Sequence, residues 1–208
     1  MKVIAINGSP RANGNTYHAI KEVFKELEKE NIETEVIHIG RDKISGCMGC
    51  GKCYKTKDDK CIIQDDNLNL WIEKLKEADG IIFGSPVFYA GINGTMKSFM
   101  DRLFYVAGAN GIFRHKVGAA VVAVRRSGGI PTFNQLNIFM TYSEMVLASS
   151  NYWNVIHGTM PKDAEQDAEG NQIMQVLGQN MAWLLKTIAE SKVEKPAKVK
   201  KIMTNFIR

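Results

Sequence analysis

Residues 3–16 of the chain have the sequence VIAINGSPRANGNT, and this stretch decides the fold. Its first four residues are apolar, which is typical of a short buried strand. The Asn, Gly, Ser and Pro residues that follow end a strand and form a loop. Asn15 and Thr16 are both of a type that caps helices, and an amphipathic segment follows them. The stretch therefore predicts a strand, a polar loop and a helix in succession.

The polar loop has the chemistry of a phosphate-binding site. Backbone N–H groups in such a loop point into the space above the strand end, and the helix N-terminus adds partial positive charge. The loop lacks the Gly-Lys-Ser/Thr ending of a triphosphate loop and the G-x-G-x-x-G pattern of dinucleotide folds. We therefore predict that it binds one terminal monophosphate, such as that of FMN, through Ser9, Arg11, Asn13, Asn15 and Thr16. The alternative is an ordinary turn whose polar residues only cap the helix.

The rest of the chain continues the alternation of strand and helix. Apolar runs predict further strands at residues 33–39, 80–84, 117–124 and 152–156. Apolar residues at helical spacing predict helices at residues 16–30, from 65 onward, around 96–103, from 131 onward and at 173–188. This order predicts a three-layer α/β sandwich in which a five-stranded parallel sheet carries helices on both faces. Residues 1–191 form the expected domain, residues 40–65 a long loop within it, residues 162–171 an exposed loop, and residues 192–208 a basic tail.

Composition excludes several other classes of protein. The chain has 208 residues, of which 45% are hydrophobic and 24% charged, as in an ordinary globular domain. No apolar run approaches the length of a membrane span, and the start of the chain has no signal-peptide pattern, so we expect a cytoplasmic protein without membrane contact. The net charge of +5 gathers in the last residues as a solvated tail, and nothing in the pattern indicates nucleic-acid binding.

Two further loops are expected beside the first one. Ligands of open parallel sheets bind outside the carboxyl ends of the strands, and the loops at 85–91 and 125–131 both follow strands. The first has a rigid proline and two aromatic residues, which suit a flat ring, and the second has glycines that allow close approach. The alternatives are a loop buried against a partner subunit and a turn with two surface arginines. The predicted ring-binding residues are Ser85, Pro86, Val87, Phe88, Tyr89, Gly91, Arg126, Ser127, Gly128 and Gly129.

All four cysteines fall in one short segment. Residues 47–53 read CMGCGKC, and Cys61 follows after seven more residues, giving the pattern C-x2-C-x2-C-x7-C. In a protein expected to be cytoplasmic, such clustering favours metal or redox chemistry over structural disulfides.

The motifs together resemble one family. The sequence GSPRANGNT at residues 8–16, directly after the first strand, resembles the flavodoxin-like NAD(P)H-dependent FMN reductases. The cysteine motif is similar to that of the iron–sulfur flavoproteins within this group. The sequence at residues 91–102 also resembles the family, and we interpret its Lys97, Asp101 and Arg102 as structural rather than catalytic. The resemblance implies a flavodoxin-like fold, bound FMN and a homodimer or homotetramer.

The resemblance also implies a [4Fe–4S] cluster held by Cys47, Cys50, Cys53 and Cys61. Four thiolates on one flexible loop suit such a cluster, since the glycines between them let the chain turn tightly. Two alternatives stay open. The same ligands could hold zinc, and many flavodoxin-like reductases carry a similar cysteine stretch but contain only flavin.

These observations lead to a function hypothesis. The expected activity is FMN-dependent transfer of electrons from NAD(P)H or a reduced carrier to a quinone, a nitro or azo compound, or a redox protein. The four histidines are scattered and are expected to be packing or surface residues, because hydride transfer to a flavin needs no protein base. The alternatives are a ferredoxin-linked electron-transfer protein and a redox sensor that uses the cysteine loop as its detector.

Overall fold

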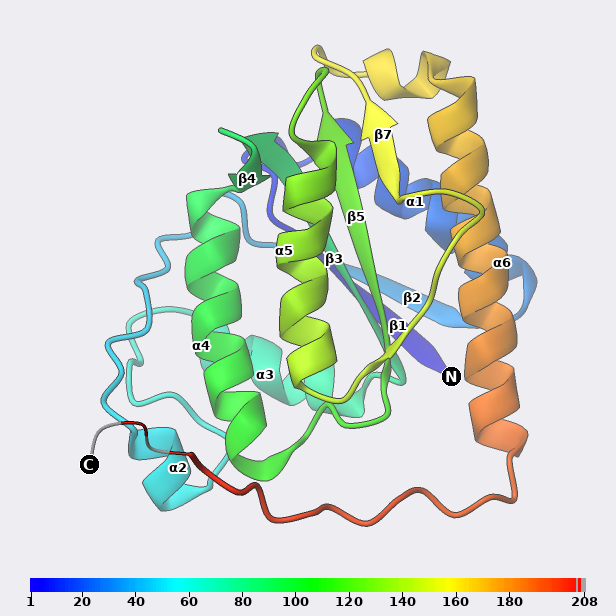
Figure 1. Cartoon of the computed structure of the whole chain (residues 1–208). Helices are drawn as coiled ribbons and strands as arrows, with labels where there is room; N and C mark the ends of the chain where they lie inside the picture. The colour runs from blue at the N-terminus through cyan, green and yellow to red at the C-terminus, as the bar shows by residue number, and fades with distance from the viewer. Residues whose placement is uncertain (205, 207–208) are drawn as a thin grey trace.

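A computed structural model describes residues 1–204 and residue 206 of the chain. A central sheet lies between two layers of helices, as Figure 1 shows. Strands β1 (Lys2–Asn7), β2 (Glu33–His38), β3 (Gly80–Phe88) and β5 (Val117–Val124) form the parallel sheet in the order β2-β1-β3-β5. The short strands β6 (Val146–Leu147) and β7 (Val155–His157) both pair with β5 in parallel. The predicted flavodoxin-like sandwich is therefore confirmed, with its fifth strand divided into two pieces.

Helices cover both faces of the sheet. One face carries α1 (Asn15–Lys29) and α6 (Ala168–Glu190), which pack against each other. The other face carries α3 (Leu68–Glu77), α4 (Gly94–Asn110) and α5 (Gly129–Tyr142). The short helix α2 (Lys52–Thr56) and a 3-10 helix (Asp163–Gln166) lie in the connections.

The alternation of side chains along each strand produces two separate cores. In β1, Ile4 and Ile6 face α3 and α4, whereas Val3 and Ala5 face α1 and α6. Strand β5 is buried at every position, as expected for a parallel strand covered on both faces. The two cores are the reason that the strand segments read as continuous apolar runs rather than alternating ones.

Several predicted boundaries were wrong. Strand β3 does not end at 84 but continues to Phe88, where it turns back into β4 (Gly91–Ile92) as a small antiparallel hairpin. The last strand covers 155–157 rather than 152–156. The expected loop at 162–171 contains the 3-10 helix and the first turn of α6, whose N-cap Asp167 accepts a hydrogen bond from the Gly170 amide.

The N-terminus of α1 also differs from the prediction. Neither Asn15 nor Thr16 caps the helix, since both lie inside its first turn. The N-cap is Gly14, and no side chain caps the free amides there. This leaves the backbone N–H groups of the first turn available to a ligand.

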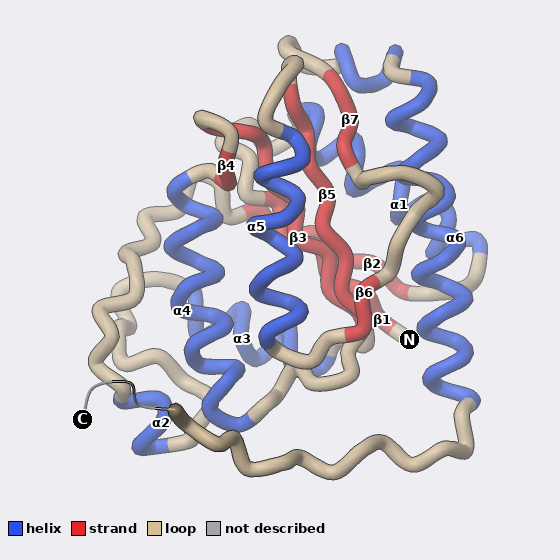
Figure 2. Tube along the Cα trace, viewed as in Figure 1, coloured by secondary structure: helices blue, strands red, loops and turns tan. Residues whose placement is uncertain are grey.

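The chain after α6 runs back across the molecule as an extended tail, visible in Figure 2 as a long loop toward α2. Its predicted separation from the domain at residue 191 stays a prediction. Neither the 23-residue α6 nor any other helix in the described part of the chain combines the length and apolar character of a membrane span.

Candidate functional site

The main candidate site is a cavity of about 230 Å³ above the carboxyl ends of β1, β3 and β5. Because these three strands are neighbours in the sheet, the loops that follow them meet at one edge, as the sequence predicts. The loop after β7 closes the cavity on the fourth side. The lining residues are Ser9, Pro10, Arg11, Asn15, Thr16, Pro86, Val87, Phe88, Ala123, Arg125, Gly158 and Thr159.

The loop after β1 is held in shape by its own side chains. Asn7 donates from Nδ2 to the Ala12 carbonyl over 3.1 Å, and its Oδ1 accepts from the Ser9 amide over 3.1 Å. Ser9 Oγ in turn accepts from the Arg11 amide over 3.2 Å. Asn7 is fully buried, so these bonds are shielded from water. The loop is therefore preorganised before any ligand arrives.

Residues at and just after the end of β2 support this loop from outside. His38 Nε2 donates to the Ser9 carbonyl over 2.7 Å, and Arg41 Nε donates to the Pro10 carbonyl over 2.8 Å. Gly40 lies so close that a Cβ atom on it would be 1.9 Å from the Ser9 carbonyl oxygen. The Ser9 and Pro10 carbonyls are thus hydrogen-bonded to side chains from the end of β2 and the segment after it.

Four of the five residues predicted to bind phosphate line the cavity, namely Ser9, Arg11, Asn15 and Thr16. Asn13 is exposed and does not line it. The Asn15 side chain is already engaged, because its Nδ2 donates to the Met160 carbonyl over 3.0 Å and its Oδ1 accepts from the Ala164 amide over 3.4 Å. Asn15 therefore anchors the loop after β7. The role of these residues in phosphate binding stays a prediction.

The carboxyl end of β3, which was predicted as a loop, forms a second wall. Pro86, Val87 and Phe88 line the cavity. Ser85 lies beneath them, fully buried, with its Oγ 3.2 Å from Asn93 Oδ1, and Asn93 Nδ2 donates to the Gly8 carbonyl over 2.8 Å. This chain of hydrogen bonds ties the first and second loops together.

Two predicted residues of the second loop lie elsewhere. Tyr89 is fully exposed at the tip of the β3–β4 hairpin, and Gly91 lies next to the side chain of Gln135. Neither lines the cavity.

The third loop divides between two cavities. Arg125, which the sequence analysis did not select, lines the main cavity. The predicted Arg126, Gly128 and Gly129 line a second cavity of about 360 Å³, whose walls include Trp153 and His157. The predicted Ser127 lines neither. Two consecutive arginines therefore line two different cavities, Arg125 the main one and Arg126 the second.

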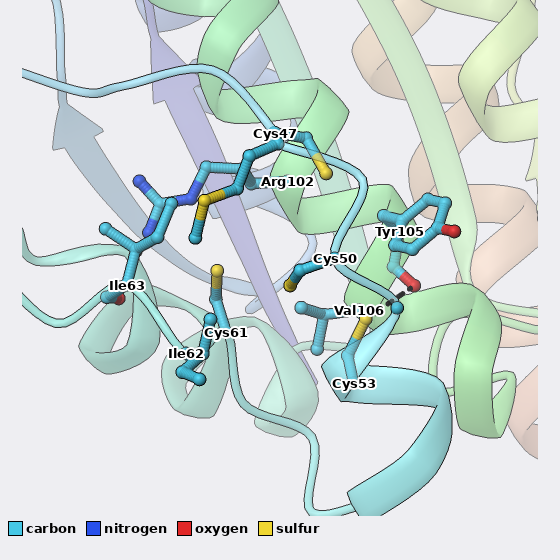
Figure 3. A pocket seen from close by; sticks show the side chains of 11 residues that line it. Cys47, Cys50, Cys53, Cys61, Ile62, Ile63, Arg102, Tyr105 and Val106 are labelled. Atoms are coloured by element: carbon cyan, nitrogen blue, oxygen red, sulfur yellow. Dashed lines mark hydrogen bonds between the residues drawn. The ribbon is translucent and has the colours of Figure 1, made fainter.

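The cysteine segment forms a separate site against α4. Figure 3 shows Cys47, Cys50, Cys53 and Cys61 around one cavity, with Arg102 and Tyr105 on its wall. All four thiols are free of disulfides. Cys53 is buried and donates from Sγ to the Tyr105 carbonyl over 3.8 Å. Burial raises the pKa of the Cys53 thiol, so binding to a metal would have to displace its proton.

The four thiols are not gathered as metal ligands. Over residues 1–204 and 206, no group of three or more His, Cys, Asp or Glu side chains is arranged to hold a metal ion. The cavity measures about 20 Å³, which is close to the space of one water molecule. The donor set itself fits a thiolate-bound metal or cluster, but the loop has to open before such a group can enter.

Arg102 is the most unusual residue at this site. Its side chain is fully buried and pairs with the carboxylate of Asp66, which is 5% exposed. Burial alone would lower the pKa of Arg102. Two neighbours, the hydrogen-bonded Asp66 and the nearby Cys61, together raise the pKa of Arg102 above its ordinary value. The guanidinium is therefore a permanent positive charge beside the cysteines.

A flavodoxin-like sheet with a preorganised polar loop at a helix N-terminus defines a flavin-binding type of α/β protein. Comparison with known proteins agrees. Residues 1–159 match the family model of the NADPH-dependent FMN reductases, and the chain belongs to this family. Membership supports FMN as the cofactor and an FMN-dependent oxidoreductase as the general activity.

Curated relatives carry the name iron-sulfur flavoprotein. One, from Methanocaldococcus jannaschii, is 36% identical over 195 residues, which covers 90% of this chain and 99% of the relative. Another, from Methanosarcina thermophila, is 28% identical over 194 residues, covering 92% of this chain and 99% of the relative. The resemblance to the FMN reductases, and to the iron–sulfur flavoproteins among them, is therefore confirmed at the level of the family.

Solved structures agree on the fold. A flavodoxin-type WrbA-like protein from Agrobacterium tumefaciens has a TM-score of 0.64 at 14% identity, covering 89% of this chain and 98% of the other. An NAD(P)H:quinone oxidoreductase from Methanothermobacter marburgensis has a TM-score of 0.65 at 13% identity, covering 87% and 96%. At such low identity these matches show the fold alone.

Sequence reasoning missed the residues that support the loops. Asn7, His38 and Asn93 each hold a backbone group of a cavity loop, yet the sequence analysis gave none of them a role. The one available signal was Asn7 itself, since a polar residue ends an otherwise apolar strand. The contribution of Gly158 and Thr159 had no signal, because their position depends on where β7 ends.

Proposed function

We propose that the chain is an FMN-dependent oxidoreductase that takes electrons from NAD(P)H or a reduced carrier. Its acceptor would be a quinone, a nitro or azo compound, or a redox protein. The observation that carries this proposal is that the loops after β1 and β5 meet the carboxyl end of β3 around one cavity with a free helix N-terminus. Family membership supports the flavin, and the residues that line the cavity are of types that suit its phosphate and its ring.

Different residues of the cavity would contact the phosphate and the ring of FMN. The uncapped amides of α1, with Thr16 and the guanidinium of Arg11, face the place where a phosphate would be neutralised. Pro86, Val87 and Phe88 offer an apolar wall to a flat ring. Arg125, which follows the neighbouring strand β5, places a positive charge at the cavity, which favours negative charge on a bound ligand. When bound, FMN supplies the ability to accept a hydride and to release electrons one at a time.

The phosphate assignment is tested by comparing FMN with riboflavin, which lacks the phosphate. Flavin fluorescence titrations would measure both affinities in the wild-type protein and in an Arg11→Gln/Thr16→Val double variant. We expect the wild-type protein to bind FMN more tightly than riboflavin, and the double variant to lose at least tenfold in FMN affinity only. A tenfold loss corresponds to about 1.4 kcal/mol, which is the size of one charge-assisted hydrogen bond.

The matched control is Arg114→Gln/Thr34→Val, which removes the same groups far from the cavity. It should bind both flavins as the wild-type protein does. A double variant at Arg11 and Thr16 that keeps the full preference for FMN would show that the phosphate lies elsewhere.

We propose further that Cys47, Cys50, Cys53 and Cys61 hold a [4Fe–4S] cluster. The support is the donor set around one cavity and the name of the curated relatives. When bound, such a cluster supplies one-electron transfer. Protein purified without oxygen should contain about four irons per chain and a broad absorption shoulder near 400 nm beside the flavin bands. Zinc in place of iron, or no metal, would replace this proposal with one of its two alternatives.

A second function is a ferredoxin-linked electron-transfer protein without a small-molecule substrate of its own. The cysteine site favours this function because helix α4 connects it to the main cavity. The cysteine site lies against α4, and α4 begins directly after Asn93, which donates a hydrogen bond to the loop at the main cavity. Steady-state oxidation of NAD(P)H with a quinone acceptor separates the two functions. Rapid turnover supports the reductase, whereas slow turnover combined with fast reduction by ferredoxin supports the electron-transfer protein.

A further inference from the structure

Arg102 connects the cysteine segment to the body of the protein. It projects from α4 and lines the cavity that the four cysteines surround, as Figure 3 shows. At 1% exposure it is one of the most deeply buried side chains in the described chain. A buried arginine is costly unless all of its charge and its donors are used, so its neighbours define its role.

The terminal nitrogens of Arg102 hold both ends of the cysteine segment. Nη1 donates to the Ser45 carbonyl over 3.4 Å, just before Cys47. Nη2 donates to the Ile63 carbonyl over 3.2 Å, just after Cys61. Both also donate to the carboxylate of Asp66. One guanidinium is therefore hydrogen-bonded to the chain on both sides of the cysteine segment, at Ser45 and at Ile63.

The remaining donor of this side chain is unused. Arg102 Nε is buried and has no hydrogen-bond partner within the described residues. Leaving a buried N–H unpaired destabilises the folded protein, so an unpaired donor at a cavity wall indicates a missing acceptor. The cavity that Arg102 lines is otherwise surrounded by sulfur and apolar groups, and Cys61 lies beside the guanidinium. A thiolate or sulfide sulfur is the acceptor that this place can supply.

We propose that Arg102 is a positioning residue that donates its Nε–H to a sulfur of the metal-bound cysteine site and raises the reduction potential of that site. The proposal rests on the proposed cluster. Reduction adds one electron from an external reductant to the cluster, breaks no bond and makes its net charge more negative by one. A fixed positive charge and an N–H donor both favour the more negative state. Asp66 opposes this effect, because its carboxylate is the counter-charge of the guanidinium.

This arrangement predicts opposite shifts from two neighbouring substitutions. Arg102→Gln removes the positive charge and the Nε–H, so the cluster should become harder to reduce. Asp66→Asn keeps the guanidinium but removes its counter-charge, so the cluster should become easier to reduce. We expect each shift to change the ratio of reduced to oxidised cluster at a fixed potential by at least tenfold, which is 59 mV for one electron. A residue that only holds the fold would not give shifts of opposite sign.

The experiment is a redox titration of the full-length protein followed by electron paramagnetic resonance, with iron counted in each sample. Arg114→Gln is the matched control, since Arg114 pairs with the exposed Glu144 away from the cysteines. Its potential should equal that of the wild-type protein. Arg102→Lys, which keeps the charge and loses the Nε–H, should give a smaller downward shift than Arg102→Gln.

The outcomes separate the two proposals. Wild-type protein without iron would overturn both the cluster and the role of Arg102. Wild-type and variant proteins with full iron and equal potentials would overturn the role of Arg102 alone. If Arg102→Gln does not fold or does not retain iron, Asp66→Asn and Arg102→Lys decide: shifts up and down respectively support the proposal, and unchanged potentials overturn it.

Discussion

At the scale of single residues, the shape of the main cavity depends on close approach of the backbone as much as on polar side chains. Gly40 is the sharpest case, because any Cβ there would overlap the Ser9 carbonyl, which His38 also holds. The contact joins the end of β2 to the polar loop after β1. A substitution at Gly40 therefore acts on the predicted phosphate site without removing any group that could touch a phosphate.

We expect Gly40→Ala to displace the Ser9 carbonyl and to lower FMN affinity by at least tenfold, about 1.4 kcal/mol. Flavin fluorescence titration measures the affinity. Gly46→Ala is the matched control, since no atom lies within 4 Å of its added Cβ, and it should bind FMN normally. Equal affinities in the two variants would mean that the shape of this loop does not govern binding.

At the same scale, the sequence indicated which residues lie at the site. It did not indicate which of their side chains are already hydrogen-bonded within the protein. Ser9, Arg11, Asn15 and Thr16 were all found at the cavity because the loop follows a strand at the sheet edge. The engagement of Asn15 by Met160 and Ala164 was not predictable, because those partners lie about 150 positions away in the chain. A motif predicts a place, and tertiary contacts decide which donors remain available there.

At the scale of elements, the β3–β4 hairpin carries backbone strain. Its two turn residues, Tyr89 and Ala90, have φ values of 49° and 58°, a left-handed conformation that normally requires glycine or asparagine. Strain of this kind is retained where a position is constrained by its surroundings. Here Ala90 lies against Gly128, and a Cβ on Gly128 would be 2.8 Å from the Ala90 Cα. The hairpin therefore links the second and third loops of the cavity.

Ala90→Gly should relieve this strain and stabilise the protein by about 1 kcal/mol, because glycine adopts positive φ without a steric penalty. Urea unfolding measures the change in the free energy of unfolding. Ala109→Gly, inside helix α4, is the control with the opposite sign and should destabilise by up to about 1 kcal/mol. A destabilising Ala90→Gly would contradict the assignment of strain to this turn.

The packing of α1 on α6 predicts a dependence on pH. Glu26 is 8% exposed and accepts hydrogen bonds from Lys29 over 2.6 Å and from Gln179 over 3.1 Å. The hydrogen bond from Lys29 is the main cause that lowers the pKa of Glu26 below its ordinary value. A lowered pKa means that the folded state prefers the carboxylate, so this stabilisation is present above the pKa of the unfolded chain. It is lost as the pH falls through the lower pKa of the folded protein.

Unfolding free energies measured between neutral pH and pH 3 should therefore fall less steeply in Glu26→Gln than in the wild-type protein. The difference isolates Glu26 from the other carboxylates, which titrate in both proteins. Glu77→Gln, an exposed residue of α3, should follow the wild-type curve. Parallel curves for Glu26→Gln and the wild-type protein would show that the α1–α6 interface does not require the charge.

At the scale of the whole molecule, the parallel sheet with helices on both faces was predictable from the alternation of apolar runs and amphipathic segments. A parallel sheet demands a crossover between strands, and each helix between two strands provides one. The division of the fifth strand was not predictable in the same way. Strands β6 and β7 contain two and three residues, which is too short for a periodic signal. The arrangement of the cysteine thiols also lay beyond pattern reasoning, since a metal group would itself order that loop.

The predicted boundary between the domain and its tail leads to a last prediction. The tail runs back across the ends of α4 and α5, where Arg114 donates to the Pro196 carbonyl and Lys201 to the hydroxyl of Tyr142. It encloses a cavity of about 900 Å³ instead of packing closely, and Val199 and Ile202 are 84% and 91% exposed. Few apolar atoms leave water, so the tail has little means of stabilising the fold.

A variant that ends at residue 191 should therefore unfold in urea with a free energy within about 0.5 kcal/mol of the full chain. It should also bind FMN with the same affinity, because none of the tail residues that the structure describes lines the main cavity. The exposed contact between Lys201 and Tyr142 adds little to the free energy of unfolding. Raising the ionic strength should therefore leave the two proteins equally stable. A loss of several kcal/mol on truncation would mean that the tail is part of the folding unit and that the domain extends beyond residue 191.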